Sequence, residues 1–160
     1  QHMSGALFDM MANIKTSHVP YKATPQSVTA VMGGEVVMSF ASVSVAQSVV
    51  KTGKLKGLGV TSAKRVTVWP EMPTIAESGL PGFDVAAWFG FSATGGTPAA
   101  VVQRLNTEFR KAQNDTVVRS RLVEQGMEML ESSPEEFSRY IKEEITKWAK
   151  VVQASGARAD

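Results

Sequence analysis

The sequence predicts an α/β fold in which helices flank a largely parallel sheet, and three observations carry this prediction. β-rich runs alternate with helical runs over residues 19–61, an order typical of parallel strands joined by helices. The first two of these helical runs each start with a hydroxyl-bearing residue just after a β-rich run, as in strand–turn–helix units. The chain has 160 residues, of which 43% are apolar and 20% charged, which fits one globular body with its own core.

The first half of the chain is expected to alternate helices and strands after an opening helix over residues 5–13. Thr24-Pro25 opens the next helix, because a hydroxyl caps the first turn and proline lacks an N–H group that this turn leaves unpaired. Ser42 or Ser44 caps the helix after that. The strands are expected over residues 19–21, 36–40 and 56–61, and these two helices run to Gly33 and through Val50.

The second half begins with a connector and continues mainly as helix. Prolines and glycines punctuate residues 66–82 and leave room only for a short helix at 74–77. A strand over residues 85–94 follows, with a bend at Gly90. The remaining elements are amphipathic helices over residues 97–114, 115–125 and 133–155 and a brief strand over residues 127–130.

The charges and the missing residue types exclude several classes of function. Lys and Arg number 17 against 15 Asp and Glu, so we expect no nucleic-acid partner. The sequence has no cysteine, which excludes disulfides, cysteine zinc sites and thiol nucleophiles. His2 and His18 are the only histidines and supply neither a metal cluster nor a Ser-His-Asp set. We therefore predict no catalytic residue, no metal and no cofactor.

Two strand-to-helix turns form the candidate site. They are expected at the carboxyl ends of neighbouring parallel strands, where open α/β sheets bind ligands. Each turn directs the unpaired N–H groups of a helix start toward the crevice, and such groups bind carboxylate or phosphate. The residues alone leave two interpretations open, an anion site or simple helix capping. The candidate ligand-binding residues are Tyr21, Lys22, Ala23, Thr24, Ala41, Ser42 and Val43.

Ordered sequence blocks show a family resemblance from residue 4 to about residue 157. The blocks are HVPYK at 18–22, GGEV at 33–36, TGKLKGLGVTSAKR at 52–65, PEMPTIAESGLPGF at 70–83, AWFGF at 87–91 and GTPAAVVQRLN at 96–106. They closely resemble the Bug family, the extracytoplasmic solute receptors of tripartite tricarboxylate transporters. The resemblance implies a periplasmic, non-enzymatic binding protein of the type II class, with two α/β lobes that close on a small carboxylate, and membrane transporter subunits as partners.

Two departures from the family pattern bear on the ligand. Ala23 stands where many members have glycine, a small change for a turn. Ala41 stands where members often have an aspartate suited to a ligand's amino group. Without that acid, and with Lys22 nearby, the expected solute is a di- or tricarboxylate rather than an amino acid.

The resemblance also predicts the organisation of the chain. Residues 1–3 are expected to be an expression scar, residues 4–86 the ligand-binding second lobe, and residues 87–160 a crossover strand and helical segment that return to the first lobe. The signal peptide and part of the first lobe are expected to be missing. Apolar surface over residues 85–109 and along the last helix would then lack cover, and we expect a homodimer.

Two other classes of function remain as alternatives. An effector-sensing domain of a transcription regulator shares the general fold class but should follow a helix-turn-helix, which is absent here. A small-molecule enzyme of the α/β class needs a base, nucleophile or metal set, which the sequence lacks at usable spacing.

Overall fold

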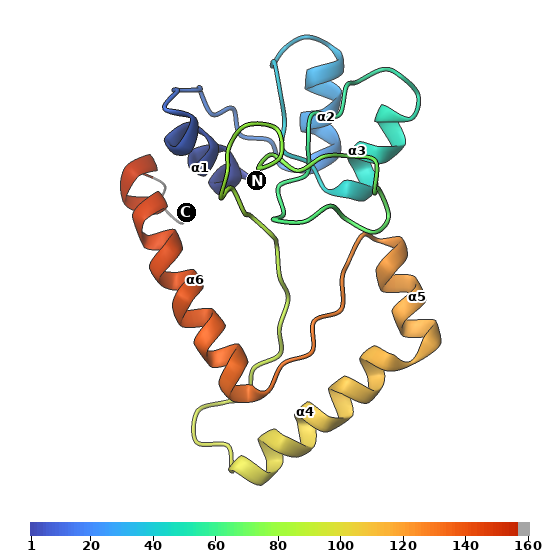
Figure 1. Cartoon of the computed structure of the whole chain (residues 1–160), viewed down its shortest axis with the longest axis vertical. Helices are drawn as coiled ribbons and strands as arrows, with labels where there is room; N and C mark the ends of the chain where they lie inside the picture. The colour runs from blue at the N-terminus through green and yellow to red at the C-terminus, as the bar shows by residue number, and fades with distance from the viewer. Residues whose placement is uncertain (157–160) are drawn as a thin grey trace. The chain divides into compact units, whose positions relative to one another are not determined.

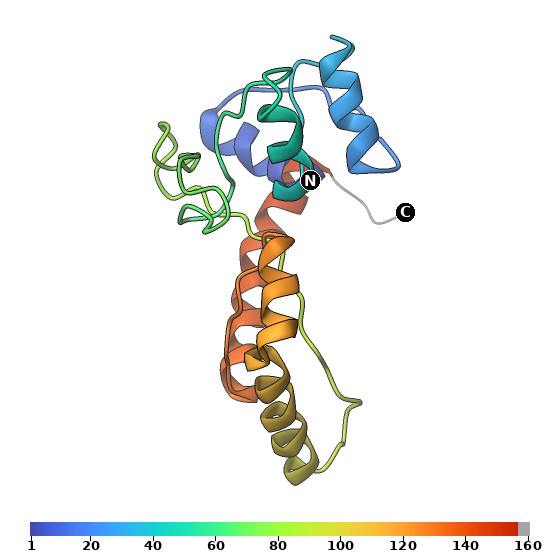
Figure 2. The same cartoon turned by 90° about the vertical axis from the view of Figure 1, so that its right-hand side faces the viewer.

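The computed structural model describes residues 1–156, and α-helices are its regular elements (Figures 1 and 2). In chain order they are α1 (His2–Ala12), α2 (Thr24–Met32), α3 (Val43–Val50), α4 (Ala99–Asn114), α5 (Thr116–Glu124) and α6 (Pro134–Ser155). The chain divides into two compact units. Unit 1 comprises residues 1–86 and the chain from Val151 onward, and unit 2 comprises residues 87–150. The single body expected from length is therefore wrong, because each unit makes its contacts mainly within itself.

Helices α5 and α6 of unit 2 begin with side-chain caps. The Asp115 carboxylate accepts hydrogen bonds from Val117 N and Val118 N at 3.0 and 3.1 Å, which caps α5. At the start of α6, Ser133 N donates to Glu136 Oε2 at 2.8 Å and Glu136 N donates to Ser133 Oγ at 3.1 Å. This reciprocal pair is a capping box, which satisfies two backbone donors at the helix start.

Helix α1 begins at His2 rather than at residue 5, and the assignment of residues 1–3 to an expression scar stays a prediction. Two local predictions in unit 1 are wrong. Thr24 lies inside α2, whose N-cap is Ala23, and its hydroxyl instead accepts a 2.6 Å hydrogen bond from Gln1 Nε2. Residues 74–77 form a turn instead of a short helix, because Gly79 follows with a φ of 122°, which a helix does not continue through.

The expected strands form no paired ladder within residues 1–156. The segments 19–21, 36–40, 85–94 and 127–130 contain no strand residues, and the segment 56–61 makes one parallel bridge, between Val60 and Thr74. In that bridge Val60 N donates to Pro73 O at 2.8 Å and Ile75 N donates to Val60 O at 2.9 Å. A β-rich run becomes a strand only when a neighbouring run pairs along its length, and these segments lie beside turns and helices instead.

The core of unit 1 lies under α3 and the turn that follows Val60. Buried Val60, Trp69 and Met72 pack together, and the apolar face of α3 covers them with Val43 and Val50. A second group of aromatic rings contacts α1. Its members are Phe8, Phe40 and Phe83, with Phe8 edge-on to the other two rings at centroid distances of 6.2 and 6.3 Å.

Unit 2 is held together mainly by partly exposed contacts. None of its residues is buried, and α4 packs against α5. Phe91 stacks on Phe109 of α4 at 4.1 Å between ring centroids. The segment before α6 is tied to α4, because Glu131 accepts hydrogen bonds from Arg110 Nε at 2.9 Å and from Asn114 Nδ2 at 2.8 Å. The pKa of Glu131 is lowered, first by the Asn114 hydrogen bond and then by the hydrogen bond and charge of Arg110.

Candidate functional site

The first predicted turn leads into α2 with extended backbone. Ala23 is the N-cap, with φ −150° and ψ 149°, and its methyl group offers no acceptor to the N–H groups of the first helical turn. Pro25 stands in that turn and has no N–H group. Lys22 is exposed, and Tyr21 and Thr24 are half-buried. The helix start is therefore open toward solvent, with a cation next to it.

The second predicted turn leads into α3 in a similar way. Ser42 is the N-cap, with φ −63° and ψ 146°, and its hydroxyl makes no capping hydrogen bond. Ala41 is half-buried, and the Val43 side chain points inward, where it packs against the buried Val60 cluster. The contribution of Val43 to a site is thus its backbone N–H group at the positive end of the helix dipole.

The segment that leads into the second turn contacts α2. Helices α2 and α3 lie next to each other in both views (Figures 1 and 2) and contact one another. Ser39 Oγ donates to Ser27 Oγ at 2.9 Å, and Ser27 Oγ donates to Thr24 O at 2.9 Å. This relay joins the two turns. The sequence reasoning missed Ser27 and Ser39, although a serine three residues after Thr24 lies in the first turns of the same helix.

A shallow depression of about 300 Å³ lies along α2 beside the first turn. Its lining residues are Tyr21, Pro25, Gln26, Thr29, Ala30 and Glu35. The Glu35 carboxylate comes from the GGEV block and was not among the predicted site residues. The negative charge of Glu35 makes this depression unfavourable for an anion.

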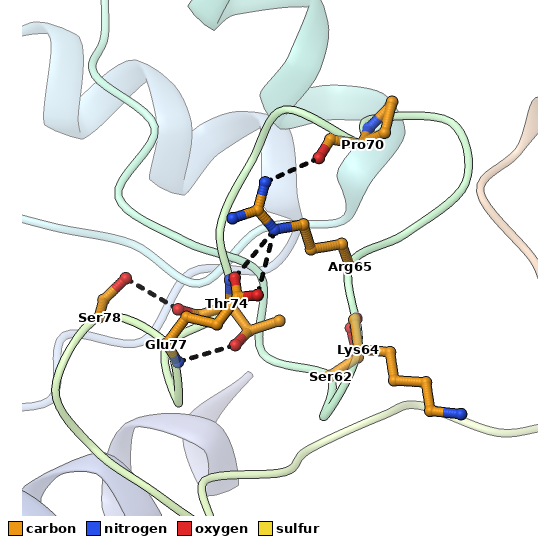
Figure 3. A network of polar contacts seen from close by, with 7 residues as sticks. All are labelled: Ser62, Lys64, Arg65, Pro70, Thr74, Glu77 and Ser78. Atoms are coloured by element: carbon orange, nitrogen blue, oxygen red, sulfur yellow. Dashed lines mark hydrogen bonds and ion pairs between the residues drawn. The ribbon is translucent and has the colours of Figure 1, made fainter.

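A polar network fixes the loop that follows Val60 (Figure 3). Arg65 Nε donates to Glu77 Oε2 at 2.9 Å, and Arg65 Nη1 donates to Pro70 O at 3.1 Å. Thr74 N donates to the same Glu77 oxygen at 2.8 Å, and Glu77 N donates to Thr74 Oγ1 at 2.9 Å. The backbone hydrogen bond from Thr74, followed by the Arg65 hydrogen bond, lowers the pKa of Glu77. The Thr-x-x-Glu pattern therefore closes a turn here.

The remaining titratable groups include the two histidines, which lie side by side. Within residues 1–156, no group of three or more His, Asp or Glu side chains is placed to hold a metal ion. His18 stacks on His2 with ring centroids 4.0 Å apart. The pKa of His18 is lowered, chiefly by partial burial and then by the nearby His2 and amino terminus. The helices of this part of the chain include none that is both long and apolar enough to cross a bilayer.

The family model described as "Tripartite tricarboxylate transporter family receptor" matches residues 1–157. The chain belongs to this family. A curated relative is Protein BugT of Bordetella pertussis, 29% identical over 98% of this chain and 48% of that protein. The chain spans about half the length of most of the curated relatives it matches. The resemblance to the Bug receptors stated from the sequence blocks is confirmed.

Two solved structures resemble this chain along nearly its whole length. One is described as "R. palustris Rpa4515 with adipate", with a TM-score of 0.78 and 32% identity over 97% of this chain and 52% of that one. The other is MatC (Rpa3494) from Rhodopseudomonas palustris with bound malate, with a TM-score of 0.70 and 31% identity over 94% of this chain and 52% of that one. The predicted fold class, a type II periplasmic-binding-protein-like α/β fold, is thereby confirmed, although residues 1–156 hold no paired strand. The comparisons favour a receptor over a regulator domain or an enzyme.

Proposed function

We propose that the protein is a periplasmic receptor that binds a small organic di- or tricarboxylate and delivers it to the membrane subunits of a tripartite transporter. The observation that carries this proposal is the pair of uncapped helix starts, α2 and α3, joined by the Ser39–Ser27 relay. The solved relatives with adipate and malate support it, since both molecules are dicarboxylates.

In this proposal the helix starts bind the carboxylates. The N–H group of Val43 and its neighbours in α3 bind one oxygen pair, because helix N-termini carry partial positive charge and free donors. The Lys22 ammonium favours a second negative group, and the hydroxyls of Tyr21 and Ser42 supply further donors. Ala41 offers no acceptor to an amino group, so a ligand ammonium would lose its hydration without a partner.

Calorimetric titration with mono-, di- and tricarboxylates tests the site. We expect Val43→Pro to weaken binding by about tenfold or more, because it removes one hydrogen bond to a charged group. Proline is tolerated at the first position of a helix, and Ala99→Pro makes the same change at the start of α4 as a matched control. Unchanged affinity in Val43→Pro would remove the second turn from the site. Lys22→Met should lower affinity more for tricarboxylates than for monocarboxylates.

We also propose that the protein binds its solute without converting it. The site needs only donors and a cation for binding, and the groups described above include no base placed against a nucleophile. Incubating purified protein with bound carboxylate and analysing the solute by mass spectrometry should return it unchanged. Turnover that survives chelation and repurification would contradict this.

A second copy of the chain is the partner we propose for the apolar side chains of unit 2. Phe89 and Phe91 are 83% and 72% exposed, and exposed aromatic groups of this kind favour association. A two-fold axis would let each copy cover the other. Light scattering of the 160-residue chain should give the mass of a dimer. A monomer at tens of micromolar that does not bind a hydrophobic dye would contradict the proposal.

A further inference from the structure

The chain passes between the two units twice, and a tryptophan stands close to each passage. The first passage lies between Ala86 and Ala87, and the second lies between Lys150 and Val151. Trp88 follows the first passage and Trp148 precedes the second. Both belong to unit 2, where the indole N–H groups of both donate to one carboxylate oxygen. Glu144 Oε2 accepts from Trp148 Nε1 at 2.9 Å and from Trp88 Nε1 at 3.3 Å.

The Glu144 carboxylate is engaged on both oxygens. Its second oxygen, Oε1, lies 3.5 Å from Lys147 Nζ, and the Glu144 side chain is only 13% exposed. The same ammonium lies over the Trp148 ring, 5.4 Å from its centroid. Hydrogen bonds to an ionised acceptor are stronger than those between neutral groups. The Glu144 carboxylate therefore holds both indole N–H groups in place, and the Lys147 ammonium stabilises its charge.

Ring packing holds the first passage against the same face of α6. Trp88 lies edge-on to Phe137 and Tyr140, with centroid distances of 5.5 and 5.6 Å. These two residues precede Glu144 on the helix at spacings that share a face with it. A methyl group at Gly90 would overlap the Phe137 ring, so another residue type there would require that ring to shift.

We propose that Glu144 is a pin that joins the two connections between the units where they enter unit 2. The segment from Trp88 to Gly90 and the last turns of α6 before Lys150 then move as one body. This inference does not depend on which ligand the protein binds.

Paired spin labels test the pin in the 160-residue chain. The sequence has no cysteine, so Ala87→Cys with Lys150→Cys places labels only beside the two passages, at positions exposed in the structure. We expect a narrow distance distribution in the parent and a clearly broader one in Glu144→Ala. Glu143→Ala, which removes the same charge at the adjacent exposed position, should leave the distribution narrow. A distribution that Glu144→Ala leaves unchanged would overturn the proposal.

Indole N–H signals in a nitrogen-15 NMR spectrum give a second readout. The chain has 3 tryptophans, and Glu144→Ala should shift the signals of Trp88 and Trp148 and leave that of Trp69, in the core of unit 1, in place. If Glu144→Ala does not fold, Trp88→Phe keeps the ring and removes only the donor. It should shift the Trp148 signal and broaden the label distribution less than the loss of the carboxylate does. An unchanged Trp148 signal and distribution in Trp88→Phe would refute the pin.

Discussion

Phe83→Ala tests whether the aromatic group beneath α1 is the main anchor of unit 1. Phe83 is 0% exposed and is the largest of the fully buried side chains, and its ring lies edge-on to Phe8 at 6.3 Å. Truncating a buried phenylalanine costs about 3–5 kcal/mol, because the transfer free energy of the ring is lost and a cavity remains. The lost aromatic pair contributes about 0.5–1.5 kcal/mol of coupling. We therefore expect the upper part of that range, against a total stability of about 5–15 kcal/mol.

The control is Val37→Ala, a truncation to the same residue at a side chain of unit 1 that is 96% exposed. Its expected cost is within about 0.5 kcal/mol, as for other surface changes. Urea unfolding followed by Trp69 fluorescence, in a background with Phe at Trp88 and Trp148, reports on unit 1 because Trp69 lies in its core. The midpoint should fall strongly for the buried site at unchanged m-value. Equal midpoints for the two variants would refute the reasoning.

Two further predictions concern the loop after Val60. A Cβ at Gly59 would lie 3.3 Å from backbone atoms of Thr74 and its neighbours, so Gly59→Ala should lower the stability measured by thermal unfolding by about 1–3 kcal/mol. The control Gly95→Ala adds a methyl group into open space and should be neutral or slightly stabilising. Equal melting temperatures of the two variants would contradict this. The pKa of Glu77 is lowered in the folded state, so its contribution to stability is complete above the ordinary value of 4.5 and is lost as pH falls through the folded-state pKa. Glu77→Gln should therefore reduce the dependence of stability on pH in the acid range, as measured by urea unfolding. An unchanged dependence on pH would contradict this.

The helices were predictable because their signals are local. Asp115 and the Ser133–Glu136 pair cap α5 and α6 through residues two or three positions away, and the sequence contains both partners of each contact. The paired strands were not predictable in the same way. The run that ends near Val60 finds its partner at Thr74 within a turn, and no local pattern specifies whether a β-rich run will meet another along its length.

The candidate site was predictable in part for the same reason. The turns before α2 and α3 follow from residues next to one another, so the positions of Ala23 and Ser42 as N-caps agree with helix starts expected there. The hydrogen bond between Ser39 and Ser27 joins residues 12 apart in sequence, and the depression beside Tyr21 depends on how α2 meets the segment after it. Such features need the packed structure. That the seven predicted residues bind a ligand stays a prediction.

The blocks that carry the family resemblance have structural roles in this fold. Gly59 admits the backbone near Thr74, the Thr74–Glu77 pair closes a turn, and Gly90 lets the chain approach the Phe137 ring. These three features fix the framework, whereas the HVPYK block contains Tyr21 and Lys22 of the proposed site. In the proposed site, solute choice depends on a few positions at the starts of α2 and α3. Of the two departures described above, Ala41 changes the chemistry more, since an alkyl group stands where the resemblance implies an acid. Ala41→Asp should therefore shift preference from dicarboxylates toward amino acids, and unchanged preference in competition calorimetry would separate solute choice from this turn.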